Sequence, residues 1–159
     1  MTNYQTSLTS NEFLNGVTGE TAIANYVEII ENVIHTLEHE HTAMFSYPPE
    51  GGNLWKFKYG SVEVFVQLTG NSNEDTLTVW AAVLKLPAKD EPRLLRHLLE
   101  LNCSSTLEAR FGIIDNQVVV ISTRTLTELS AGEISRLITI VATIANNNDE
   151  ALQAEFGAD

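Results

Sequence analysis

The stretch from Lys89 to Thr125 constrains the fold most, because it predicts a short leucine-rich helix followed by a two-stranded hairpin. Asp90, Glu91 and Pro92 are typical of a helix start. The Asp90 carboxylate can accept hydrogen bonds from free amides, and the charge of Glu91 suits the positive end of the helix dipole. Pro92 costs nothing in the first turn, where its N–H would have no partner. A helix is therefore predicted to begin at this point.

The predicted helix carries more apolar surface than packing on one sheet requires. At about 100° per residue, its five leucines cover an arc of roughly 160°, against about 100° for an ordinary amphipathic helix. Leu94, Leu98 and Leu101 form one stripe, and Leu95 and Leu99 lie beside it. Since one sheet face covers only the stripe, Leu95 and Leu99 are the candidate contacts of a homodimer or of a protein partner.

Two apolar segments after this helix predict an antiparallel hairpin. Residues 106–114 alternate between apolar and polar side chains, as in a half-buried strand. The apolar ones are Leu107, Ala109, Phe111 and Ile113. Asp115 and Asn116 tolerate a left-handed backbone and predict a tight turn. Residues 118–121 are apolar on both sides, which is typical of an inner strand.

The remaining residues predict a helix and three strands before this unit and one helix after it. A helix is expected from Gly19 to about His41, followed by a break at the proline and glycine residues of 48–52. Alternation predicts strands over residues 54–59, 62–68 and 77–86. A capping box from Ser130 to Glu133 opens the last helix, which we expect to end at residues 146–148.

The order α-β-β-β-α-β-β-α predicts an α+β, two-layer fold with helices packed on an antiparallel sheet of about five strands. At 159 residues, the chain fits a single domain covering residues 1–159. We expect residues 1–18 to form a loose N-terminal arm and residues 149–159 to form an acidic, frayed tail, although Leu152 and Phe156 could dock as one extra helical turn.

The net charge and the cysteine content indicate which kinds of partner and which cellular compartment to expect. Nine basic and twenty-one acidic residues give a net charge of −12, which repels nucleic acid and anionic lipid, so we expect neither as a partner. Cys103 is the one cysteine; it excludes an internal disulfide and is expected to be buried. No secretory signal or membrane-length apolar run is recognisable. The expected location is the cytoplasm.

No stretch carries a catalytic or cofactor motif such as a nucleophile elbow, a phosphate loop or a dinucleotide turn. We therefore predict no catalytic residue and no cofactor. His35 and His39 lie one helical turn apart, with Glu31 before them and His41 after them, and such a pair can share a metal ion. The acid within H-E-x-x-H is missing, however, and exposed Glu–His pairs also stabilise helices. The sequence therefore predicts no metal site here.

Aromatic side chains in the predicted strands support an alternative function. Trp55, Tyr59, Phe65 and Trp80 could line a pocket for a small ligand or a substrate, although core packing is the commoner role of such residues. A deep cavity around Trp55 and Trp80 would favour a small-ligand binder or an enzyme. A filled core and an exposed apolar surface would favour a protein-binding module.

Four stretches of packing residues allow a comparison with known families. They are Tyr59-Gly-Ser-Val-Glu-Val64, Val83-Leu-Lys-Leu-Pro87, Leu94-Leu-Arg-His-Leu-Leu-Glu-Leu-Asn102, and Arg110-Phe-Gly-Ile113 followed by Val118-Val-Val120. Over about residues 20–148 the chain resembles the YbjN-type domain family, in particular its small cyanobacterial relatives. The resemblance implies the fold of type III secretion chaperones, with helices on one face of an antiparallel sheet, in homodimers that bind other proteins. The family is sometimes described as sensory-transduction regulators, and it implies no catalytic residues.

Overall fold

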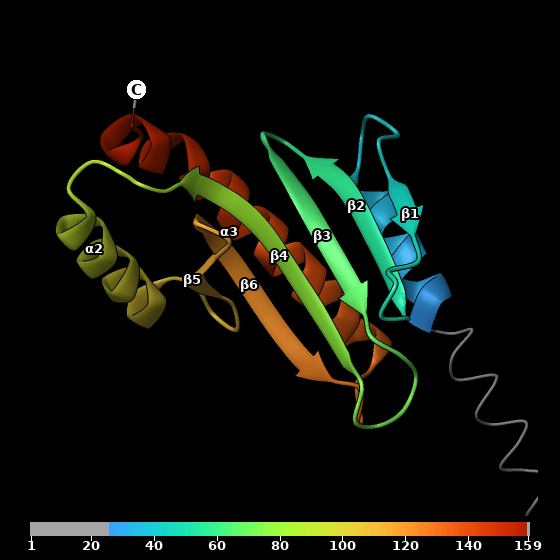
Figure 1. Ribbon diagram of the computed structural model, residues 1–159. Helices are drawn as coiled ribbons and strands as arrows, with labels where there is room; N and C mark the ends of the chain where they lie inside the picture. Colours follow the sequence, from blue (N-terminus) through green and yellow to red (C-terminus); the bar gives the residue numbers. More distant parts are fainter. Residues whose placement is uncertain (1–25, 159) are drawn as a thin grey trace, which may run out of the picture.

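Six strands form one antiparallel sheet within residues 26–158, the part of the chain that the computed structural model describes (Figure 1). Their order across the sheet is β1-β2-β3-β4-β6-β5. The strands are β1 (Met44–Ser46), β2 (Asn53–Tyr59), β3 (Val62–Leu68), β4 (Thr76–Lys85), β5 (Arg110–Ile114) and β6 (Gln117–Thr125). The helices are α2 (Glu91–Ser104), α3 (Ala131–Phe156) and an N-terminal helix whose described part covers residues 26–37.

The α+β class and the antiparallel sheet are confirmed, but the expected five strands are one too few. The additional strand is β1, which has three exposed residues and pairs only with β2, from Met44 opposite Lys56 to Ser46 opposite Leu54. A strand this short with no buried face has no apolar–polar alternation by which to recognise it. The predicted N-terminal arm, residues 1–18, lies outside the described residues.

The core lies between one face of the sheet and the long helix α3, which crosses behind the sheet in Figure 1. Val64, Val66, Leu77 and Val79 alternate along β3 and β4 and are fully buried on this face. The matching side chains of α3 recur every three or four residues and are Ile134, Leu137, Ile138, Val141, Ala142 and Ala145. Burying each large aliphatic side chain stabilises the fold by about 1.5–3 kcal/mol relative to exposure, so this layer contributes most of the stability.

The helix starts predicted at Asp90 and Ser130 are confirmed, whereas the start predicted at Gly19 lies outside the described residues. The Asp90 side chain accepts a hydrogen bond from the Arg93 N–H at 3.4 Å, which satisfies one of the free donors of α2. At α3, the Ser130 hydroxyl accepts from the Glu133 N–H at 3.2 Å, and the Glu133 carboxylate accepts from the Ser130 N–H at 2.9 Å. These caps depend only on neighbours in the sequence, which is why the sequence predicts them.

The hairpin has the predicted turn but a shorter first strand. Asp115 and Asn116 have φ angles of 48° and 58°, the left-handed conformation that a tight two-residue turn requires. β6 lies between β4 and β5, which confirms the inner strand. β5 begins only at Arg110, because the Ala109 N–H donates to the Thr106 carbonyl in a turn and Leu107 points into solvent, 74% exposed.

The C-terminal segment is part of the core instead of a frayed tail. The asparagines at 146–148 were expected to end the last helix, but α3 continues to Phe156. Leu152 and Phe156 are 3% and 1% exposed. Asparagine costs at most about 0.7 kcal/mol per residue in a helix, and burial of these two apolar side chains outweighs that cost.

Phe156→Ala tests this correction. The substitution should lower the free energy of unfolding by about 3–5 kcal/mol, because it opens a cavity between α3 and α2, where Arg93 lies 4.6 Å above the ring. Tyr47→Ala, at an aromatic residue that is 76% exposed, should change it by less than about 0.5 kcal/mol. Urea denaturation followed by circular dichroism measures both. Equal effects would mean that the tail does not belong to the core.

Candidate interaction surfaces

The large apolar side chains that remain exposed among residues 26–158 fall into two groups. The first group lies in or next to β1 and consists of Met44, Phe45 and Tyr47. The second group lies in α2, in the loop after it and in β5, and consists of Leu95, Leu99, Leu107, Ile113 and Ile114. β1 and β5 are the two edge strands of the sheet (Figure 1). We call the first group the β1 surface and the second the α2/β5 surface. They lie at opposite ends of the sheet.

The α2/β5 surface has a rigid base. Leu94 and Leu98 are 0% and 5% exposed. The Asn102 side chain accepts from the Phe111 N–H at 2.7 Å and donates to the Phe111 carbonyl at 3.2 Å. One amide thus takes the place of a neighbouring strand at the outer edge of β5. Sequence reasoning did not identify this role of Asn102, because its hydrogen-bonding partner lies in the next element.

The predicted contact residues lie on the face of α2 adjacent to this base, about 100° around the helix from Leu94 and Leu98. Leu95 is 41% exposed and Leu99 is 66% exposed. Cys103, which we expected to be buried, is also exposed, because it lies one turn beyond Leu99 on the same side of the helix. Arg96 and Glu100 form an ion pair at 3.1 Å beside these residues. The exposed face of α2 is therefore apolar, and the charges of Arg96 and Glu100 beside it neutralise each other.

The β1 surface is apolar within an acidic stretch of chain. The ring of Phe45 packs edge-on against Tyr47, with centroids 4.6 Å apart, and also contacts Trp55. Residues 26–50 contain five glutamates and no lysine or arginine. Within the described residues, no strand pairs with the outer edge of β1. This edge can accept a further strand from another polypeptide.

The sheet separates the aromatic side chains that were predicted to share a pocket. Trp55 is buried and faces the helices together with Tyr59, as the pairing of β2 with β3 shows. Phe65 and Trp80 lie on the opposite face, stacked with ring centroids 5.2 Å apart. The two tryptophans therefore cannot line one cavity.

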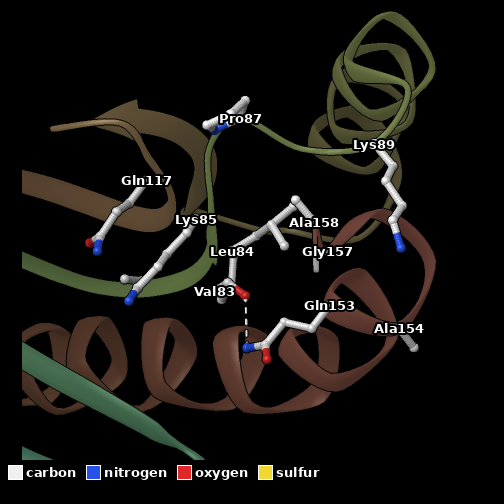
Figure 2. Close-up of a pocket in the computed structure, with 11 residues that line it drawn as sticks. Val83, Leu84, Lys85, Pro87, Lys89, Gln117, Gln153, Ala154, Gly157 and Ala158 are labelled. Carbon is white, nitrogen blue, oxygen red and sulfur yellow. Dashed lines mark hydrogen bonds between the residues drawn. The ribbon is translucent and has the colours of Figure 1, made fainter.

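A hollow of about 600 Å³ lies between the end of β4 and the C-terminal half of α3 (Figure 2). Lys85, Lys89, Gln117 and Gln153 are its polar lining residues. The Gln153 amide donates to the Val83 carbonyl at 3.3 Å, as the dashed line in Figure 2 shows. Within the described residues, the lining has no carboxylate, histidine, thiol or hydroxyl side chain. The ionisable side chains of this lining are those of Lys85 and Lys89.

A smaller hollow contains two carboxylates, both already paired. Arg136 donates to the two oxygens of Glu108 at 2.7 and 3.3 Å, and these bonds hold the pKa of the Glu108 carboxyl below its usual value. Hydrogen bonds from Ser130 and then Arg124 likewise lower the pKa of Glu133. Both groups are ionised at neutral pH, so neither is suited to act as a general acid.

The histidines near the end of the N-terminal helix are not arranged as the sequence spacing suggested. The helix ends at residue 37. His35, Glu38 and His41 come together, with one potential ligand atom from each within 4.8 Å of the others, and His39 is not in this group. The spacing could not reveal Glu38 and His41 as neighbours of His35, because their approach depends on the turn after the helix.

None of the helices within residues 26–158 is long and apolar enough to span a membrane. No curated protein matches the sequence. Among solved structures, the chain is similar to a chain in the crystal structure of the ExsC–ExsE complex, a type III secretion chaperone complex. The TM-score is 0.58 at 15% identity, over 82% of this chain and 95% of that one. The likeness confirms the chaperone-like fold.

The family comparison covers most of the sequence. A model described as "Putative bacterial sensory transduction regulator", named YbjN, matches residues 27–154. The match includes all four stretches on which the resemblance rests and extends into the part of α3 that the sequence had assigned to a frayed tail. The chain belongs to the YbjN family.

Proposed function

We propose that this protein is a non-catalytic protein-binding module, chaperone-like or regulatory, that acts as a homodimer in the cytoplasm. The observation that carries the proposal is the division of the exposed apolar side chains into two surfaces at opposite edges of one sheet. Monomers seldom leave contiguous apolar surface exposed. YbjN membership, and a structural neighbour that is itself a complex of two proteins, support a polypeptide partner.

For the homodimer we propose the α2/β5 surface, with Leu95 and Leu99 at or near the contact. Two copies related by a twofold axis bury the same residues twice, so one apolar surface serves both chains. The Arg96–Glu100 pair keeps the local charge balanced, which matters when each chain carries a net charge of −12. The base formed by Asn102 and the buried leucines holds α2 in place before association, so little ordering is required on binding.

For the polypeptide partner we propose the β1 surface. An extended segment can pair along the free edge of β1 while its apolar side chains meet Phe45 and Tyr47. The five glutamates of residues 26–50 favour a segment that also carries lysine or arginine. Because the two surfaces lie at opposite ends of the sheet, a dimer leaves one β1 surface free on each chain.

Leu99→Glu tests the dimer. A charge placed near the centre of an interface of about 1,600 Å² should weaken self-association at least roughly 100-fold, since burying an unpaired carboxylate is costly. The variant should be a folded monomer by light scattering and circular dichroism at tens of micromolar. Met44→Glu is the matched control, because Met44 and Leu99 are 64% and 66% exposed, and it should remain a dimer.

Three outcomes contradict the proposed dimer. Wild-type protein that is monomeric at tens of micromolar has no such interface. Dissociation by Met44→Glu to the same extent as by Leu99→Glu would place the contact elsewhere or reflect added charge alone. Unfolding of Leu99→Glu would mean that this leucine belongs to the core of a single chain.

Tyr47→Asp tests the partner surface. A protein that co-purifies with the wild type should be lost from this variant and retained by Leu107→Asp. Leu107 is the matched control because it lies at the other edge of the sheet and is as exposed as Tyr47 (74% against 76%).

Salt dependence tests the charge of the partner. The association rate of the co-purified protein with the wild type should fall roughly tenfold or more between about 20 and 150 mM salt, because attraction to an acidic surface is screened. A flat salt response would contradict electrostatic attraction, and equal loss in both variants would contradict the β1 surface.

A further inference from the structure

We propose that His35, Glu38 and His41 bind one divalent transition-metal ion, best matched by Zn²⁺. Two imidazoles and one carboxylate form an established set of protein ligands for zinc. One ligand atom from each side chain lies within 4.8 Å of the others. In a tetrahedral site with metal–ligand distances of about 2.0–2.2 Å, neighbouring ligand atoms lie roughly 3.4 Å apart. Small side-chain rotations are enough to bring the three atoms around one ion.

The chain segment after the N-terminal helix makes this arrangement. The Glu38 N–H still donates to the Ile34 carbonyl, at 2.9 Å, so Glu38 follows His35 by nearly one turn and lies close to it. His41 then has a φ of 51°, a left-handed conformation that is uncommon for residues other than glycine. This turn directs the chain back, and the rings of His35 and His41 lie with centroids 6.2 Å apart.

Within residues 26–158, one oxygen of the Glu38 carboxylate accepts a hydrogen bond and the other accepts none. Its Oε2 accepts from the Ala43 N–H at 2.9 Å, which fixes the loop that carries His41. Glu38 is only 9% exposed, and among the described residues no lysine or arginine pairs with it. A buried carboxylate without a cation is costly. A divalent ion bound at Oε1 would supply the missing positive charge.

The surroundings favour a cation over an anion. The C-terminal end of the N-terminal helix carries the negative end of the helix dipole, and residues 26–50 add five glutamates. Nearby, Glu31 accepts a hydrogen bond from Trp55 at 3.4 Å, and Glu40 pairs with Lys58 at 3.3 Å. These two carboxylates are therefore already engaged, which leaves Glu38 as the acidic ligand of the group.

Three protein ligands leave one coordination position open for water or for a group from another molecule. A hollow of about 250 Å³ beside the cluster is lined by His35, Glu38, Met44, Phe45 and Trp55, so the open position lies next to the β1 surface. A bound ion would tie the loop before β1 to the end of the helix. This inference does not depend on the proposed function, because it rests on the ligand geometry, the burial of Glu38 and the local charge.

The test is calorimetric titration of ZnSO₄ into the full chain without a histidine tag, at about pH 7.5, where imidazole is mostly neutral. We expect one Zn²⁺ per chain, and Co²⁺ bound at the same site should give the intense visible absorption of tetrahedral coordination. His41→Ala and Glu38→Gln should each weaken binding at least roughly 100-fold, the upper end of the loss caused by removing an outer-shell partner. Glu38→Gln retains an oxygen that can accept from the Ala43 N–H, so it separates ion binding from loop closure.

His39→Ala and His97→Ala are matched controls, because they remove the other two histidines of the chain. Both should leave the affinity within roughly threefold of the wild type, and circular dichroism should show that every variant is folded. Absence of saturable Zn²⁺ binding overturns the proposal. Binding that persists unchanged in His41→Ala shows adventitious ions only. A loss in His39→Ala equal to that in His41→Ala would contradict the proposed ligand set, because His39 would then contribute to binding as much as His41 does.

Discussion

The packing of α3 against one face of the sheet is the interaction on which the rest of the structure depends. β4 lies in the middle of that sheet, and Leu77, Val79, Ala81 and Val83 are 0–1% exposed beneath the helix. Since a single helix of 26 residues spans this face, its burial explains why α3 continues through three asparagines to Phe156. Local helix propensity has the smaller effect here.

This one-sided arrangement determines where the interaction surfaces lie. Strand order places β1 and β5 at the edges, beyond the part of the sheet that α3 covers most closely. An uncovered edge is open to pairing with other chains unless something protects it. At β5 the protection is Asn102 on α2, whose amide satisfies both backbone groups of Phe111. At β1 the strand is only three residues long and is preceded by a loop held by Glu38.

The same loop connects the two proposals. Its closure by the bond from Ala43 to Glu38 brings His41 toward His35 and also sets the start of β1. The proposed ion and the proposed partner surface would therefore share one structural element, although each rests on its own observations.

What the sequence determined by itself was local. The cap at Asp90, the capping box at Ser130, the turn at Asp115 and Asn116 and the inner position of β6 were all predicted, because each depends on neighbours in the chain or on a two-residue or three- to four-residue period. The division of α2 into buried Leu94 and Leu98 and exposed Leu95 and Leu99 also follows from helical period. The YbjN resemblance rested on the same packing patterns.

Tertiary structure decided the rest. The separation of Trp55 from Trp80, the burial of Phe156, the capping of β5 by Asn102 and the approach of His41 to His35 each require residues whose distance in space is set by strand register or by the direction of a loop. Register and loop direction follow from the burial of the whole sheet face, a sum over many side chains that no short window of sequence contains.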